Sequence, residues 1–228
     1  MFVTLQSDMD VKIKGVLFEM DGVVIDTEKL YTRFWMEAAQ VLGFPMTYEQ
    51  SLGMRALNAQ RGEALLKHYF GESVVYLQLR DKRIELMEAY IAEHGVEEKP
   101  GIRELLAYLK ENSIPCAITS SSSVPLIRRH LGNLGLLEGF TALCSGKDVP
   151  HGKPAPDIYL HGAATLGLKP EECLAIEDSP AGIEAAYRAG THPVMVPDQD
   201  QPSEETLDMC FAKADSLTDI IGLLESLK

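Results

Sequence analysis

The chain has 228 residues, 46% of them hydrophobic, and a formal net charge of -13 at pH 7. This length and composition allow a full hydrophobic core in one large domain or two smaller ones. The acidic balance leaves no basic surface for the backbone of DNA or RNA, so we expect no polymeric nucleic acid as a partner. Because the same charge repels anions, any phosphorylated ligand would need local cations and a metal.

Cysteine spacing and the first residues indicate the compartment. The four cysteines show no Cys-x-x-Cys spacing, which disfavours a zinc site or a disulfide framework and is typical of free thiols in a reducing cytoplasm. Residues 1–11 lack the basic start and the apolar centre of a signal peptide, and no apolar stretch approaches membrane-spanning length. We therefore expect a cytoplasmic protein with no membrane partner.

The first predicted strand, residues 14–18, is a short apolar run with β-branched and aromatic side chains. Two acids follow it directly, Glu19 and Asp21, and their two-residue spacing points them the same way on an extended chain. Ligands of open α/β sheets bind in the crevice outside the carboxyl ends of the strands. This pair of carboxylates therefore suits a metal and a phosphoryl group.

Residues 29–98 show helical periodicity and almost no strand signal, which predicts an all-helical domain inserted into the chain. Residues 47–50 have the form of a capping box, which marks a helix start. The apolar positions that define the predicted helices are Phe34, Ala38, Val41, Leu42, Leu65, Leu66, Tyr69, Ile84, Met87 and Ile91.

From residue 99 onward, short strands and helices alternate. Strands are predicted at residues 115–119, 141–144, 173–176 and 193–196, and helices at 102–109, 157–166, 181–189 and 215–228. Such βαβ alternation predicts an α/β fold with a doubly wound, Rossmann-like parallel sheet. We expect a core domain of residues 1–28 and 99–228, interrupted by a helical cap domain of residues 29–98.

Four polar clusters follow predicted strands, and the carboxyl ends of parallel strands share one edge of a sheet. The clusters are Glu19 with Asp21, the hydroxyl run 119–123, the loop 151–157 that holds Lys153, and the acidic pair Glu177 and Asp178. Each cluster alone is equally consistent with a cap, a turn or a solvated loop. Together they supply an anion site and hard oxygen ligands, which favour Mg2+ over zinc.

Through the motifs Glu19-Met20-Asp21-Gly22-Val23, Ser120, Lys153 and Glu177-Asp178-Ser179, the chain resembles the haloacid dehalogenase-like hydrolases. It is similar to their helical-cap, beta-phosphoglucomutase-like subgroup and to the branch that includes pseudouridine-monophosphate phosphatase. The resemblance covers nearly all of residues 12–228. It implies Mg2+-dependent hydrolysis of a small phosphorylated metabolite, a sugar phosphate or a nucleoside monophosphate, in which a carboxylate attacks phosphorus and the acyl phosphate is then hydrolysed.

The same resemblance implies a role for each motif residue. Glu19 stands at the nucleophile position, and Asp21 would protonate the leaving oxygen and later activate water. Ser120 and Lys153 would hold phosphoryl oxygens, with Thr119 as the alternative to Ser120. The implied metal ligands are Glu19, Asp21, Glu177 and Asp178.

The expected substrate-binding residues are Gly22, Tyr31, Arg55 and Ser121. Arg55 resembles part of a cap loop that reaches the substrate, where it would pair with a carboxylate or a second phosphate; an ordinary exposed arginine is the alternative. Tyr31 resembles the phosphatase branch, because the family's sugar-phosphate mutases tend to have a histidine at the matching position. Dehalogenation is disfavoured, since that branch generally lacks the second acid that Asp21 supplies.

Glu19 departs from the family, which places aspartate at the nucleophile position. Its carboxylate reaches about 1.5 Å further, and a misplacement of about 1 Å can lower a rate on the order of 100-fold. An engineered substitution and a natural divergence both explain the glutamate. Three functions stay open: a phosphatase, a sugar-phosphate phosphomutase, and a catalytically inactive protein that binds phosphate ligands. For each we expect a monomer or weak homodimer.

Overall fold

The apolar runs of the chain form a seven-stranded sheet in the computed structural model, which describes residues 2–4, 11–54, 57, 59–198 and 201–228. The strand order is β1-β7-β6-β5-β2-β3-β4. The strands are β1 Phe2–Thr4, β2 Gly15–Phe18, β3 Cys116–Ser120, β4 Ala142–Ser145, β5 Cys173–Glu177, β6 His192–Met195 and β7 Ala212–Ala214. Neighbours pair in parallel except β1 with β7. The predicted doubly wound α/β fold is confirmed, although β1 and β7 were not predicted.

The chain divides into two units, Met1–Asp26 with Glu97–Lys228 and Thr27–Val96. The first unit holds the sheet and the second holds helices α1 to α4. The helices are α1 Glu28–Val41, α2 Tyr48–Gly53, α3 Ala59–Phe70, α4 Tyr76–His94, α5 Ile102–Glu111, α6 Val124–Asn133, α7 Asp157–Thr165, α8 Pro180–Ala189, α9 Glu204–Asp208 and α10 Leu217–Ser226, with 3-10 turns η1 Leu137–Gly139 and η2 Pro170–Glu172. None of the helices in the described part of the chain combines the length and the apolar character needed to cross a membrane.

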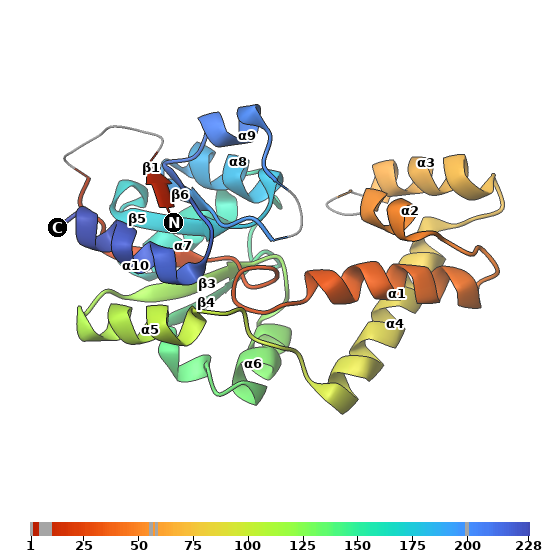
Figure 1. Cartoon of the computed structure of the whole chain (residues 1–228), viewed down its shortest axis with the longest axis horizontal. Helices are drawn as coiled ribbons and strands as arrows, with labels where there is room; N and C mark the ends of the chain where they lie inside the picture. Colours follow the sequence, from red (N-terminus) through yellow and green to blue (C-terminus); the bar gives the residue numbers. More distant parts are fainter. Residues whose placement is uncertain (1, 5–10, 55–56, 58, 199–200) are drawn as a thin grey trace. The chain divides into compact units, whose positions relative to one another are not determined.

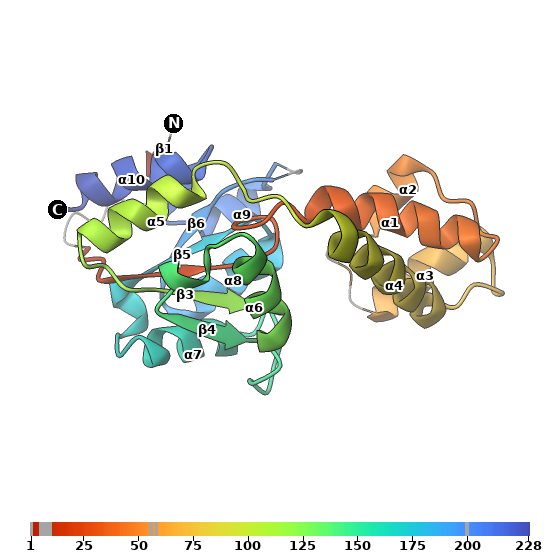
Figure 2. The ribbon, with the colours of Figure 1, turned by 90° about the horizontal axis from the view of Figure 1, so that it is seen from below.

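Helices cover both faces of the sheet. In Figures 1 and 2, α5 and α10 pack together on one face, and α7 and α8 pack together on the other. Sheets covered on both faces need continuous apolar strands, and every residue of β2, β3 and β5 is buried. Leu17, Ala117 and Ala175 lie in one buried cluster with Ile158 and Tyr159 of α7. The three central strands are therefore held firmly up to their carboxyl ends.

The strand register brings the polar ends of these strands level with one another. Phe18 pairs with Ile118 of β3 and with Ile176 of β5. The next residue, Glu19, donates its backbone N–H to the Ile176 carbonyl at 3.0 Å. Because the strands run in parallel, the residues after Phe18, Ile118 and Ile176 emerge at the same edge of the sheet.

The second unit has a hydrophobic core of its own, and the capping box predicted at residues 47–50 is confirmed. Trp35, Leu66 and Leu79 lie in one buried cluster. The capping box before α2 is present: Gln50 N donates to Thr47 Oγ1 at 3.2 Å, and Thr47 N donates to Gln50 Oε1 at 2.9 Å. The described residues of this unit form helices and no strand, because their apolar residues recur at helical spacing.

Two expected apolar positions are wrong. Val41 is 60% exposed at the end of α1, and Ile84 is 42% exposed on α4. The buried residues of α4 include Leu79, Met87 and Ile91. These residues are separated by multiples of four, and Arg83, not Ile84, stands at the intervening position on the same face. The Arg83 guanidinium lies over two aromatic rings there, 4.5 Å from the Tyr31 centroid and 5.0 Å from that of Trp35.

Candidate functional site

Lys153, in the loop before α7, joins the carboxylates that follow β2 and end β5. Its ammonium Nζ donates to Glu19 Oε2, to Glu177 Oε1 at 2.5 Å and to the Thr119 carbonyl at 3.3 Å. The side chains of Lys153, Glu19 and Glu177 are 9%, 10% and 0% exposed. Charges buried this deeply require partners of opposite sign. The structure therefore brings together three of the residues that the sequence singled out.

The three charges shift one another's pKa in different directions. Burial opposes the charge on Lys153, but the carboxylates of Glu177 and Glu19 hold its pKa well above the ordinary lysine value. Burial also opposes the charge on Glu177, yet Lys153 and hydrogen-bond donors bring its pKa below the ordinary value. Burial raises the pKa of Glu19, and Lys153 only partly offsets this. Lys153 and Glu177 therefore form the better compensated pair.

Donors surround both oxygens of the Glu177 carboxylate. Oε1 accepts from the Tyr159 hydroxyl at 2.6 Å as well as from Lys153. Oε2 accepts from the Asp178 amide at 3.1 Å, and from the Ser179 amide at 3.3 Å and hydroxyl at 3.1 Å. Both Glu177 oxygens are thus engaged within the protein in this structure, and the expected role of Glu177 as a metal ligand stays a prediction. The same contacts fix the position of the Lys153 ammonium.

Tyr159 was missed by the sequence analysis. It is fully buried in α7 between apolar neighbours, so its pattern is that of a core aromatic. Only its hydroxyl could have indicated a role at the site, since a buried tyrosine O–H needs a hydrogen-bond partner. Burial and the nearby Glu177 charge raise its pKa well above the ordinary value, so Tyr159 stays a donor.

Two glycines make room for the acidic pair after β5. A Cβ at Gly182, in α8, would overlap the Glu177 carboxylate. A Cβ at Gly22 would overlap the Asp178 carboxylate, and the φ of 77° at Gly22 also disfavours other residues. Asp178 therefore packs directly against the turn that contains Asp21, although the two acids are far apart in the sequence.

The hydroxyl run meets Asp21 through Ser122. Ser122 Oγ donates to Asp21 Oδ2 at 3.3 Å, and Ser122 N donates to Ser120 Oγ at 3.2 Å. Ser120 is fully buried, whereas Ser121 is exposed. The Thr119 hydroxyl donates to the Phe18 carbonyl at 3.2 Å and so faces the β2 backbone. Ser122 is thus the residue of this run whose hydroxyl contacts an acid, and Ser120 Oγ contacts the Ser122 amide, whereas the Thr119 hydroxyl is engaged by β2.

The remaining predicted residues belong to the second unit. Tyr31 lies on α1, where Arg83 covers its ring. Arg55 lies outside the residues that the structure describes, so its expected role stays a prediction.

Oxygen donors at this edge of the sheet fit a hard cation. No three or more His, Cys, Asp or Glu side chains within the described ranges are arranged to hold a metal ion. Lys153 already compensates Glu19 and Glu177, which leaves Asp21 and Asp178 as the acids outside that cluster. Mg2+ needs only one or two carboxylates, because water and substrate phosphate complete its shell. The donor set therefore suits Mg2+ bound together with a phosphorylated ligand.

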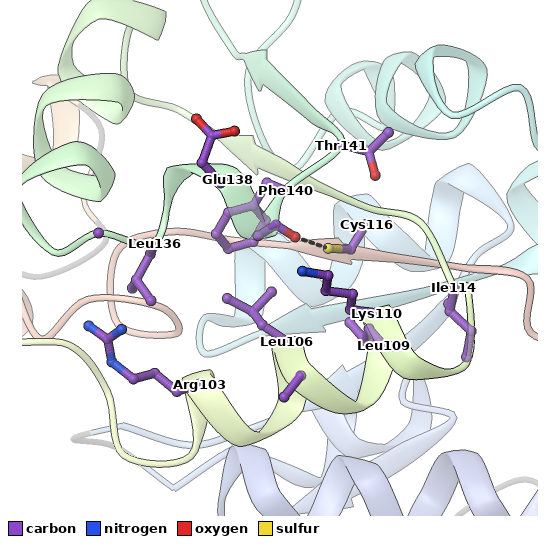
Figure 3. Close-up of a pocket in the computed structure, with 13 residues that line it drawn as sticks. Arg103, Leu106, Leu109, Lys110, Ile114, Cys116, Leu136, Glu138, Phe140 and Thr141 are labelled. Atoms are coloured by element: carbon purple, nitrogen blue, oxygen red, sulfur yellow. Dashed lines mark hydrogen bonds between the residues drawn. The ribbon is translucent and has the colours of Figure 1, made fainter.

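A cavity of about 450 Å³ lies elsewhere in the first unit, next to α5 and η1 (Figure 3). Leu106, Leu136 and Phe140 line it, and the Cys116 thiol donates there to the Gly139 carbonyl at 3.3 Å. Cys116 begins β3 and Ser120 ends it, so roughly 13 Å of strand separates the cavity from the acids. The cavity is therefore not part of the candidate site.

The sequence matches one protein-family model and is similar to several named proteins. The family model described as "haloacid dehalogenase-like hydrolase" matches residues 13–190. The chain is 33% identical to hexitol phosphatase A of Escherichia coli over 91% of this chain and 94% of that protein. It is 32% identical to a probable pseudouridine-5'-phosphatase of Drosophila melanogaster over 86% of each. It is also 30% identical to beta-phosphoglucomutase of Bacillus subtilis, over 83% and 85%.

A methyl group added at Gly182 should disrupt the Glu177 cluster. We expect Gly182→Ala to lower the free energy of unfolding by about 1–3 kcal/mol, because the methyl displaces a buried, hydrogen-bonded carboxylate. The matched control is Gly132→Ala in α6, where no atom lies within 4 Å of the added methyl; it should raise stability by about 0.4–1 kcal/mol. Urea denaturation measures both. Equal effects of the two substitutions would contradict the packing described.

Proposed function

The chain belongs to the haloacid dehalogenase-like hydrolase family, and from this premise we propose that it hydrolyses a phosphate monoester of a small metabolite, a sugar phosphate or a nucleoside monophosphate. One observation carries the proposal: Lys153 lies between acids from β2 and β5, at the edge of the sheet where Ser120 ends β3. Two relatives named as phosphatases support hydrolysis. The net charge of -13 makes this buried cation necessary, since an anionic substrate gains nothing from the overall field.

The reaction follows from the residues at the sheet edge. Lys153 and Ser120 bind phosphoryl oxygens, and a Glu19 oxygen attacks phosphorus as the ester P–O bond breaks. Asp21 gives its proton to the leaving alkoxide. The resulting Asp21 carboxylate then takes a proton from water, which attacks the acyl phosphate and releases inorganic phosphate and the Glu19 carboxylate. The Asp178 carboxylate and the backbone carbonyl of Asp21 would hold Mg2+, which would supply positive charge that offsets the charge of the phosphoryl group.

Glu177 and Tyr159 act through Lys153. The buried Glu177 carboxylate fixes the ammonium, and Tyr159 fixes the carboxylate. A phosphoryl group is bound well only where its cation is already in place, because reorganisation during the reaction costs free energy. We therefore propose that both residues position Lys153.

Substrate choice belongs to the remaining predicted residues. We propose that residues 29–98 act as a cap domain that supplies Tyr31 and Arg55. Gly22 and Ser121 of the sheet-bearing unit would also contact the substrate. Gly22 follows Asp21 and packs against the Asp178 carboxylate.

Sugar-phosphate phosphomutase activity is the second candidate, and the relationship to beta-phosphoglucomutase favours it. A mutase interconverts sugar phosphates and requires a bisphosphate activator, whereas a phosphatase releases inorganic phosphate without one. Tyr31 favours the phosphatase, since mutases tend to have a histidine there.

Shortening the nucleophile tests the proposed chemistry. We expect Glu19→Asp to raise Mg2+-dependent hydrolysis of p-nitrophenyl phosphate on the order of 100-fold, because about 1 Å of misplacement is removed. A chelator should abolish the activity. Glu204→Asp makes the same change at an exposed site in α9 and should leave the rate unaltered. Absence of turnover in both the unmodified chain and a folded Glu19→Asp variant would favour a binding protein over an enzyme.

Removing one acid tests the proposed magnesium ligands. Asp178→Asn should weaken Mg2+ binding about tenfold or more, because a neutral amide replaces a carboxylate ligand. Calorimetric titration of Mg2+ into the protein without substrate measures the affinity. Asp208→Asn, an exposed position of α9, changes the net charge equally and should have little effect. Unchanged affinity in Asp178→Asn would remove this residue from the ligand set.

A further inference from the structure

The Glu19 carboxylate lies among donors at the turn that follows β2. Its Oε1 accepts from the Met20 amide at 2.8 Å and more weakly from the Asp21 amide at 3.4 Å. Its Oε2 accepts from the Lys153 ammonium. Successive backbone N–H groups that converge on one point form a concave anion site, and an adjacent ammonium strengthens it. The anion held by these donors is the protein's own side chain.

The length of glutamate explains how one side chain reaches all of these donors. Its carboxylate lies about 1.5 Å further along the side chain than that of aspartate. The two oxygens thereby span from the amides of the turn to Lys153, which comes from a different loop. Glu19 is buried, so this contact lies within the protein and not at its surface.

A phosphate oxyanion would need the same donors. Acids surround the position: Asp21 follows in the turn, and Glu177 shares the Lys153 ammonium. An external anion therefore competes with a tethered carboxylate for a single buried cation. Tethering gives the carboxylate an effective concentration of about millimolar or more, so free phosphate at lower concentration should lose this competition.

We propose that Glu19 occupies the oxyanion site of this protein and blocks it, so that phosphate or a phosphoryl group binds only after the Glu19 carboxylate leaves the Met20 and Asp21 amides and Lys153. The inference rests on the function proposed above and adds an autoinhibitory contact at the same site. The side chain at the nucleophile position must therefore move before it can attack.

Binding of inorganic phosphate tests the inference without any turnover. Phosphate is titrated calorimetrically, in the presence of a chelator, into the full chain, Glu19→Ala and the control Glu225→Ala. Glu225 is exposed in α10, so its removal changes the net charge equally without touching the site. We expect Glu19→Ala to bind phosphate about tenfold more tightly than the full chain, and Glu225→Ala to match the full chain. Equal affinities of Glu19→Ala and Glu225→Ala would overturn the proposal.

Two further variants keep the test decisive. Glu19→Ala combined with Lys153→Ala should lose the gain in affinity, because the cation of the site is gone; retention of the gain would place phosphate elsewhere and overturn the proposal. If Glu19→Ala does not fold, as judged by circular dichroism, Glu19→Gln replaces it. Glutamine removes the charge that holds the side chain at Lys153 but keeps its volume, so it should bind phosphate at least as tightly as the full chain; weaker binding by a folded Glu19→Gln would overturn the proposal.

The outcome is separable from that of the proposed function. Tighter phosphate binding by Glu19→Ala together with an inactive Glu19→Asp supports the blocked site and contradicts the phosphatase. An active Glu19→Asp variant, with no gain in phosphate affinity in Glu19→Ala, supports the phosphatase and contradicts the blocked site.

Discussion

The buried ammonium of Lys153, held between the carboxylates of Glu19 and Glu177, is the interaction on which the site depends. It joins segments that are far apart in the sequence: the end of β2, the end of β5 and the loop before α7. The parallel register of β2 and β5 brings the two acids level, and the lysine makes their burial tolerable because each charge has a partner. Without the lysine, like charges would meet at the centre of the sheet edge.

Neighbouring elements of the fold stabilise the cluster of Lys153, Glu19 and Glu177. Tyr159 of α7 and the amides that follow β5 supply donors to Glu177, and Gly182 of α8 leaves space for its carboxylate. The same register places Glu19 at the sheet edge, where we propose that it attacks a phosphoryl group, yet its additional methylene lets the carboxylate turn back onto Met20 N. A single side chain thus belongs both to the structural cluster and to the proposed chemistry.

The sequence predicted the elements whose patterns are local. The central strands are continuous apolar runs that end in polar residues, so the parallel sheet and the gathering of Glu19, Lys153 and Glu177 at one edge could be predicted. The hydrogen-bond donors to these side chains could not be predicted, because a sequence shows which residues reach a sheet edge and not which donors they meet there. Tyr159 has the pattern of a core aromatic, and β1 and β7 are three residues each, too short to stand out. Ile84 was expected on the buried face because it fits the helical period, but Arg83 lies on that face and Ile84 is exposed.

A double-mutant cycle on Lys153 and Glu177 tests the central interaction most directly. The free energies of unfolding of Lys153→Met, Glu177→Gln and the double variant are compared with that of the full chain by urea denaturation. Lys153→Met leaves two buried carboxylates without their cation and should cost about 3–5 kcal/mol, whereas Glu177→Gln leaves Lys153 paired with Glu19 and should cost less. The double variant should be no less stable than Lys153→Met, because it removes a carboxylate that has lost its cation. If the two costs instead add to within about 0.5 kcal/mol, the lysine and the glutamate do not hold each other, and the account of the site is wrong.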